Sequence, residues 1–199
     1  MDEVTIIAVG IDAYEISTKP LIDSVRIHEP KTQIVIVDNV APTPYTDARA
    51  EIVRLPERVC MAQAMNEGAK LARSKWLVFM NNDVICHGPF VEQIKALRPN
   101  AIYGNDPLNW WGRYWLDGWI MVMPRKVFDK VGGFDPNFIY AGFEDADYCF
   151  RAVEKGYKIQ QHTFPFEHKE LHSRFTMPGY MAQREKNIQY LCEKWGITR

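Results

Sequence analysis

A run of five large apolar residues near the middle of the chain, Trp76-Leu77-Val78-Phe79-Met80, ends abruptly on the short polar residues Asn81-Asn82-Asp83. An unbroken apolar run of this kind is typical of a strand buried on both faces, as in a parallel sheet covered by helices. The carboxyl ends of such strands border the crevice where open α/β sheets bind ligands. Asp83 would then be an anionic oxygen ligand for a divalent cation. The same tripeptide also fits a simple turn, because Asn and Asp side chains bond to their own backbone.

Two earlier apolar runs repeat this design. Residues 4–10 predict a first buried strand, and residues 33–39 predict a second one that ends on an acid, Asp38. Between them, Thr18-Lys19-Pro20 indicates the start of a helix, with a capping hydroxyl and a proline in the first turn. A strand, a helix and a strand in this order predict a βαβ unit and therefore an α/β fold.

Strands and helices continue to alternate along the rest of the chain. We expect strands at 52–55 and, as a weak edge strand, at 101–104, and helices at 61–72, 88–97, 124–131, 144–156 and around 188–195. Within the helix at 144–156, Asp147 and Arg151 have the spacing of a surface ion pair. Met61 and Met65 lie on one apolar helix face and are expected in the core.

Length and charge limit the class of function. With 199 residues, 47% of them hydrophobic, the chain can bury one good core but is short for two, which predicts one domain. The 24 Lys and Arg nearly balance the 25 Asp and Glu, so no broad positive field favours nucleic acid. The four cysteines form no Cys-x-x-Cys pair and are expected to be reduced. An acidic start and the lack of a long apolar run predict neither a secretory signal nor a membrane span, so we expect a cytoplasmic protein.

Tryptophans gather in the stretch Asn109-Trp110-Trp111-Gly112-Arg113-Tyr114-Trp115. Indole rings beside glycine and arginine suit a loop that folds over a sugar and a nucleotide. A dense local aromatic core explains the same stretch equally well, so both readings stay open at this point.

A second motif follows later, where Gly132-Gly133-Phe134-Asp135 leads to Gly142-Phe143-Glu144-Asp145-Ala146-Asp147. Alone, acids in the first turn of a helix are explained by the helix dipole, which stabilises each by roughly 0.3–1 kcal/mol. The combination is more specific. Asp38 at a strand end, the Asn-Asn-Asp turn, Gly-Gly-Phe-Asp and Phe-Glu-Asp-Ala-Asp with the trailing Arg151 resemble the nucleotide-sugar glycosyltransferases of the GT-A fold, in particular the large inverting family 2. The resemblance extends from about Val4 to His168.

This resemblance implies a single GT-A (Rossmann-like) domain over residues 1–199, with a mostly parallel central sheet flanked by helices. Residues 1–100 would form the nucleotide-binding half and residues 101–199 the acceptor and catalytic half. The implied activity is inverting transfer of a hexosyl or deoxyhexosyl group from a nucleoside diphosphate sugar to a hydroxyl of a glycan or lipid-linked glycan. The implied cofactor is Mn2+ or Mg2+. A uridine diphosphate (UDP) sugar is the favoured donor, thymidine being the nearer rival, and a lipid-linked acceptor would hold the protein peripherally at a membrane.

Carried over position by position, the resemblance makes Asp145 the general base and Glu144 the residue that orients the acceptor. Asp83 would bind the metal together with His168, for which His162 and His172 are rivals. Asp38 would bond to the nucleotide base beside a wall formed by Val9 to Ile11. The whole predicted donor-binding set is Val9, Gly10, Ile11, Asp38, Asn81, Asn82, Asp83, Trp110, Trp111, Trp115 and Gly118.

Two other functions fit parts of the sequence. Asn81 and Asn82 stand where the family often has aspartates, which lowers the charge available for a metal and leaves room for a catalytically silent binding protein on the same scaffold. The Glu144-Asp145 pair argues against that alternative. A sugar nucleotidyltransferase would need a glycine-rich phosphate loop after the first strand, and Gly10-Ile11-Asp12-Ala13-Tyr14 does not supply one.

Overall fold

The computed structural model describes residues 3–11, 14–110, 112–170 and 178–198, and its central feature is a seven-stranded sheet. The order across the sheet is β10-β6-β9-β4-β1-β2-β3. Four of these strands, β3, β2, β1 and β4, run parallel to one another, and β9 is antiparallel to its neighbours β4 and β6. The predicted mostly parallel α/β sheet is confirmed. The strands are β1 (Val4–Gly10), β2 (Gln33–Asp38), β3 (Glu51–Arg54), β4 (Trp76–Asn81), β6 (Ala101–Gly104), β9 (Ile120–Pro124) and β10 (Lys158–Gln161).

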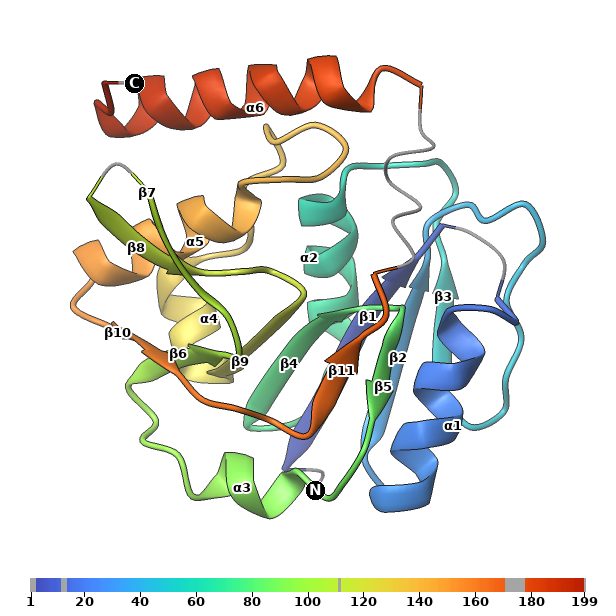
Figure 1. The fold of residues 1–199 in the computed structure, drawn as a ribbon. Helices are drawn as coiled ribbons and strands as arrows, with labels where there is room; N and C mark the ends of the chain where they lie inside the picture. The colour runs from blue at the N-terminus through green and yellow to red at the C-terminus, as the bar shows by residue number, and fades with distance from the viewer. Residues whose placement is uncertain (1–2, 12–13, 111, 171–177, 199) are drawn as a thin grey trace.

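Helices cover both faces of the sheet (Figure 1). They are α1 (Thr18–His28), α2 (Met61–Leu71), α3 (Val91–Lys95), α4 (Arg125–Val131), α5 (Glu144–Glu154) and α6 (Tyr180–Trp195). Successive residues of a strand point to opposite faces. Ile7 and Val9 of β1 accordingly belong to the core cluster that contains α2, α4, α5 and α6, whereas Ile6 and Ala8 belong to the cluster with α1 and α3. The apolar runs of the sequence are continuous because both faces are buried.

Two small sheets lie beside the large one. The strand β5 (Val84–Cys86) follows β4 after a two-residue turn and pairs with β11 (Phe166–His168) in antiparallel fashion. The strands β7 (Pro107–Trp110) and β8 (Arg113–Leu116) form a hairpin where the sequence suggested a loop. The structure also corrects the expectation for residues 101–104, because β6 lies between β10 and β9 and is not an edge strand.

Asp147 and Arg151 form the expected ion pair, but it is not at the surface. Asp147 is fully buried, and its carboxylate accepts bonds from Arg151 Nε at 2.8 Å and from Trp195 Nε1 at 3.0 Å. Lys194 Nζ lies 2.8 Å from the same carboxylate and 2.6 Å from that of Asp135. The pairing is confirmed, and only the expected exposure was wrong, because α6, which is distant in sequence, covers this acid. The interaction attaches the last turn of α6 to α5.

The start of α1 also differs from its prediction. Neither Ser17 nor Thr18 caps the helix through its side chain; both hydroxyls accept bonds from the Asn82 amide at 3.0 Å. The two hydroxyls therefore fix the turn after β4 against α1.

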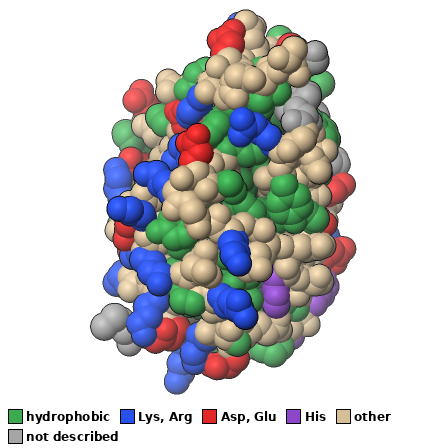
Figure 2. Space-filling model, turned by 90° about the vertical axis from the view of Figure 1, so that its left-hand side faces the viewer, with side chains coloured by type: hydrophobic (Ala, Val, Ile, Leu, Met, Phe, Trp, Pro, Cys, Tyr) green, Lys and Arg blue, Asp and Glu red, His purple; other side chains and the backbone are tan. Residues whose placement is uncertain are grey.

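The charged residues and the cysteines are distributed as follows. On the face shown in Figure 2, Lys and Arg gather along one edge with Asp and Glu among them, and hydrophobic side chains lie between. All four cysteines are free. Within the described residues, no helix combines the length and apolar character needed to cross a membrane.

Candidate active site

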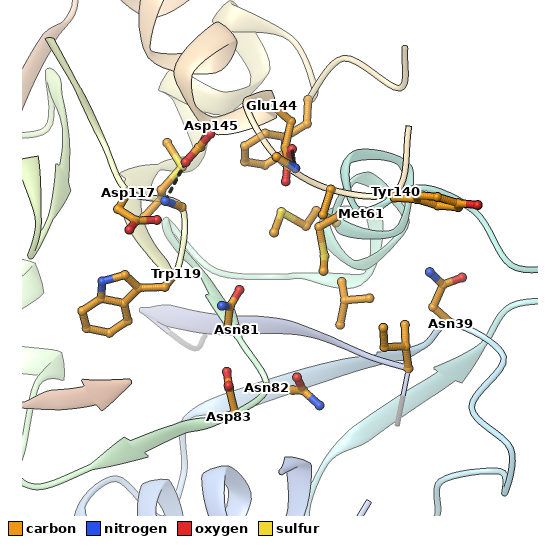
Figure 3. Close-up of a pocket in the computed structure, with 18 of the residues that line it drawn as sticks. Asn39, Met61, Asn81, Asn82, Asp83, Asp117, Trp119, Tyr140, Glu144 and Asp145 are labelled. Atoms are coloured by element: carbon orange, nitrogen blue, oxygen red, sulfur yellow. Dashed lines mark hydrogen bonds between the residues drawn. The ribbon is translucent and has the colours of Figure 1, made fainter. Parts of the chain in front are cut away.

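A pocket opens at the carboxyl ends of β1 and β4, where the sequence predicted a crevice (Figure 3). Its walls come from both halves of the chain: β1, the turn after β4, the start of α2, the segment before β9, the loop before α5, and β11. Nine residues of the predicted set line it: Val9, Ile11, Asn81, Asn82, Asp83, Gly118, Glu144, Asp145 and His168.

The pairing of β11 with β5 places His168 beside Asp83. In this register His168 is opposite Val84, and the N–H of Lys169 donates to the carbonyl of Asp83 at 2.9 Å. His168 Nε2 consequently lies 3.2 Å from Asp83 Oδ1, and both side chains are largely buried, at 13% and 12% exposure. The imidazole also stacks on the Trp119 ring, with centroids 5.3 Å apart and planes within 8°. The histidine, which lines the pocket, is thus held in one orientation.

The two asparagines of the turn have different surroundings. Asn81 Nδ2 lies 3.0 Å from His168 Nε2, so its amide belongs to the Asp83–His168 group. Asn82 directs its amide nitrogen to Ser17 and Thr18 instead. Asn82 therefore connects the turn to α1 as well as lining the pocket.

Asp145 and Glu144 face the same pocket from the start of α5 (Figure 3). Asp145 Oδ2 accepts a bond from the N–H of Gly118 at 2.8 Å, and Oδ1 accepts one from the N–H of Ala146 at 2.8 Å. A Cβ at position 118 would come within 2.9 Å of the Asp145 Cβ, so this approach requires glycine. Glu144 is buried, and its carboxylate accepts the N–H of Gly142. Both acids are held by backbone groups.

Asp117 is a second acid beside Asp145 that sequence reasoning missed. It lines the pocket immediately before Gly118, and Figure 3 shows it next to Asp145. Burial of the Asp145 carboxyl group raises its pKa from 3.8 to about 6, and the negative charge of Asp117 contributes in the same direction. The site therefore contains a carboxyl group that changes its protonation near neutral pH.

Asp38 and Gly10 do not line the pocket. The Asp38 carboxylate is fully buried and accepts bonds from the N–H groups of Ala41 and Tyr45 and from Arg54 Nη1 at 2.6 Å. Gly10 faces the Tyr45 ring, which would lie 2.3 Å from a Cβ at that position. The structure thus does not bring Asp38 into the pocket, and its carboxylate organises the chain after β2.

The tryptophan stretch is also mostly absent from the pocket. Trp115 is 2% exposed, packs edge-on against Phe150 in the core and does not line the pocket. Trp110 is 42% exposed on the hairpin, packs against Phe143 and Trp115, and lies outside the pocket. Trp111 is not among the described residues.

Of the rival histidines, His162 packs against Tyr103 and Phe164 away from the pocket, and His172 lies outside the described residues.

Further residues that line the pocket gave little signal in the sequence. They include Asn39, Arg58, Asp117, Trp119, Tyr140, Glu170 and Tyr180. Asp117 and Trp119 come from a short connection between β8 and β9, two strands that were not predicted. The Asp-Gly dipeptide at 117–118 was the available turn signal.

The comparisons with known proteins agree with this geometry. A model described as glycosyl transferase family 2 matches residues 18–105, and one described as the N-terminal domain of galactosyltransferase matches residues 104–187. A comparison with curated protein sequences gives no match.

Two solved structures are similar in fold. A mannosyltransferase from Pyrobaculum calidifontis in complex with GDP-Man and Mn2+ aligns with TM-score 0.64 and 16% identity, covering 94% of this chain. GalNAc-T7 with UDP, GalNAc and Mn2+ aligns with TM-score 0.66 and 12% identity, covering 80% of this chain. The chain covers 64% of the first structure and 41% of the second, less than two thirds of either. The fold is the GT-A fold, as the sequence resemblance implied.

The raised pKa of Asp145 predicts a pH-dependent cost to folding. From about pH 4 to about pH 6 the Asp145 carboxyl group binds a proton more tightly in the folded state than in the unfolded chain. The contribution of this group to the free energy of unfolding therefore falls as the pH rises through this range. A shift from 3.8 to about 6 corresponds to at most about 3 kcal/mol. We expect Asp145→Asn to be more stable than the unmutated chain by about this amount above pH 7, with the difference disappearing near pH 4.

Urea unfolding of both proteins across this pH range measures the difference. Asp129→Asn, which changes an exposed acid in the same isosteric way, is the control and should show no such pH-dependent difference. A difference between Asp145→Asn and the unmutated chain that is independent of pH would contradict the assigned pKa.

Proposed function

We propose that this chain, a glycosyltransferase of the GT-A type by its fold and by both family matches, transfers a sugar from a nucleoside diphosphate sugar to an acceptor hydroxyl with inversion at the anomeric carbon. The observation that supports this most is the position of Asp145 in the same pocket as the Asp83–His168 pair. Asp145 can accept a proton, and Asp83 and His168 can hold a cation beside a diphosphate. Residues of the first half would bind the donor, and residues 101–199 would bind the acceptor.

The donor atoms in the pocket fit a divalent cation that is held partly by its substrate. Asp83 and His168 offer one carboxylate and one imidazole 3.2 Å apart, and no group of three or more His, Cys, Asp or Glu suited to a metal occurs among the described residues. Mg2+ commonly uses one or two protein ligands and completes its shell with phosphate oxygens and water, and an imidazole favours Mn2+. We propose that Asp83 and His168 hold manganese or magnesium. A bound cation would supply positive charge to stabilise the departing diphosphate.

In the proposed reaction Asp145 is the general base. As the acceptor oxygen forms its bond to the anomeric carbon, the bond from that carbon to the diphosphate oxygen breaks, and the hydroxyl proton moves to the Asp145 carboxylate. A pKa of about 6 suits this role, because the group is mostly ionised at neutral pH yet binds a proton readily. The N–H groups of Gly118 and Ala146 keep the carboxylate aimed into the pocket. Glu144, fixed by Gly142, is proposed to orient the acceptor.

We propose uridine as the nucleotide base, supported by the family resemblance and by the apolar wall of Val9 and Ile11. The two structural neighbours contain GDP-Man in one case and UDP in the other. Arg58, which donates to the carbonyls of Ile11 and Val40, brings a guanidinium to this end of the pocket.

The proposed acceptor is a glycan or a lipid-linked glycan. The proposed compartment is the cytoplasm, supported by the four free cysteines.

The first test replaces the proposed base. Asp145→Asn keeps the size of the side chain and can no longer accept the proton, so turnover should fall by about 10²–10⁴. Binding of the nucleoside diphosphate should stay within about twofold, since the base acts on the acceptor. Transfer is measured over a panel of donors, with Asp129→Asn as the control that leaves the rate unchanged. Full turnover by Asp145→Asn would falsify the assignment, and nucleotide binding without any transfer by the unmutated chain would favour a silent binding protein.

The second test removes the cation or its ligands. Chelator should suppress transfer, and Asp83→Ala or His168→Ala should each abolish the metal-dependent part of nucleoside diphosphate binding, because the pair offers only two protein ligands. Glu167→Gln, an exposed acid next to His168 that does not line the pocket, is the matched control. If chelator changes neither the binding of the nucleoside diphosphate nor the turnover, the proposed metal site is wrong.

The third test concerns the base. Calorimetric titration with uridine, thymidine and guanosine diphosphates in the presence of manganese should give the tightest binding for uridine. Asp38→Asn should lower the melting temperature without changing this order, because the buried carboxylate bonds to Arg54 and to two backbone N–H groups. Tighter binding of either rival base would exclude uridine, and a reversed order in Asp38→Asn would restore a direct role for that residue.

A further inference from the structure

The loop before the two acids has an unusual backbone. Tyr140, Gly142 and Phe143 have positive φ angles of 61°, 110° and 75°. Side-chain-bearing residues seldom adopt this conformation, which costs of order 1–3 kcal/mol each and persists only where the surroundings impose it. Phe143 is also the residue from which α5 starts, so the conformation of this loop decides where Glu144 and Asp145 point.

One buried amide on α6 holds this loop. Asn187 is 1% exposed, and its Oδ1 accepts the N–H of Ile139 at 3.2 Å. Its Nδ2 lies within hydrogen-bond distance of three carbonyls, those of Ile139 at 2.9 Å, Gly142 at 3.2 Å and Ala141 at 3.5 Å. Gln183, one turn earlier, donates to the same Oδ1 at 3.1 Å. A single side chain thus makes bonds along the whole loop.

The opposite side of the loop is held by α2, where the N–H of Met61 donates to the carbonyl of Tyr140 at 2.7 Å. Between these two attachments, Tyr140, Ala141 and Gly142 form part of the pocket wall. Asn187 itself does not line the pocket, and its bonds to the loop connect it to the pocket wall.

The docking of α6 does not depend on Asn187. Ile188 and Leu191 are buried in the core, and Lys194 and Trp195 bond to Asp147. Loss of the Asn187 amide should therefore release the loop without detaching the helix. This separation makes a role in positioning distinguishable from a general role in stability.

We propose that Asn187 is a positioning residue, which keeps residues 139–143 in a conformation with positive φ at Tyr140, Gly142 and Phe143, so that Glu144 and Asp145 face the substrates. This inference rests on the proposed function for its effect on rate. It assigns to Asn187, on the C-terminal helix, a part in catalysis that does not require contact with the reacting atoms.

The test compares Asn187→Ala with Leu191→Ala at a temperature where both variants are folded. Leu191 is fully buried on the same helix and makes no bond to the loop, so its truncation, which typically costs 2–5 kcal/mol, supplies the matched loss of stability. We expect Asn187→Ala to lower kcat by about 10- to 100-fold while the KM for the donor changes less than about twofold, since misplacement of about 1 Å can cost this much. Leu191→Ala should keep kcat within about twofold.

Hydrogen exchange supplies a readout that does not depend on transfer. Amides of residues 140–145 should exchange faster in Asn187→Ala than in Leu191→Ala, and those of the sheet should not. An unchanged kcat in Asn187→Ala, or an equal loss in Leu191→Ala, would overturn the role in catalysis. If the unmutated chain transfers no sugar, the proposed function fails, and the exchange comparison still decides whether Asn187 holds the loop.

Discussion

Burial of β4 in the middle of the sheet is the constraint on which the site depends. Its partners are fixed on both sides, by β1 in parallel with Val9 opposite Asn81 and by β9 in antiparallel orientation. Because Asn81 N–H also donates to the carbonyl of Trp119 at 2.9 Å, the end of β4 is joined to the segment that carries Asp117 and Gly118. One strand end therefore brings the apolar wall, the polar turn and the acid-bearing segment to the same place. Any slip in the pairing of β4 would separate all three.

The site contains groups whose placement in this framework is unfavourable for folding. Asp145 is taken from water next to Asp117, and the backbone before it adopts conformations that side-chain-bearing residues avoid. Such costs persist when the surrounding structure determines them. Backbone N–H groups from Gly118 and Ala146 offset part of the cost at Asp145, and the ion pair of Asp147 with Lys194 attaches α5 to α6.

Sequence patterns predicted the parts of the structure that depend on local chemistry. Apolar runs predicted the parallel strands, and Asp83, Glu144 and Asp145 lie at the ends of predicted elements. The differences from expectation concern side chains whose partners are distant in sequence. Nothing in the sequence near Asp38 indicates its bond with Arg54, and nothing near Asp147 indicates that α6 buries it. The core position of Trp115 was also not evident from the sequence, because the hairpin that places its ring against Phe150 was not predicted.

His168 and Asn187 both contact parts of the site that are distant from them in sequence, but only the role of His168 could be proposed from the sequence. His168 could be proposed because the family resemblance implies a late metal-binding histidine and imidazole commonly binds metals, even though only the pairing of β11 with β5 explains its position. Asn187 carries no such chemical signal, because a buried amide in a helix is meaningful only once the carbonyls it faces are known. Its value lies in geometry: one planar group with both donor and acceptor atoms can satisfy a loop that cannot form regular backbone bonds of its own. For this fold, the sequence therefore reveals the groups suited to chemistry sooner than the groups that hold them in place.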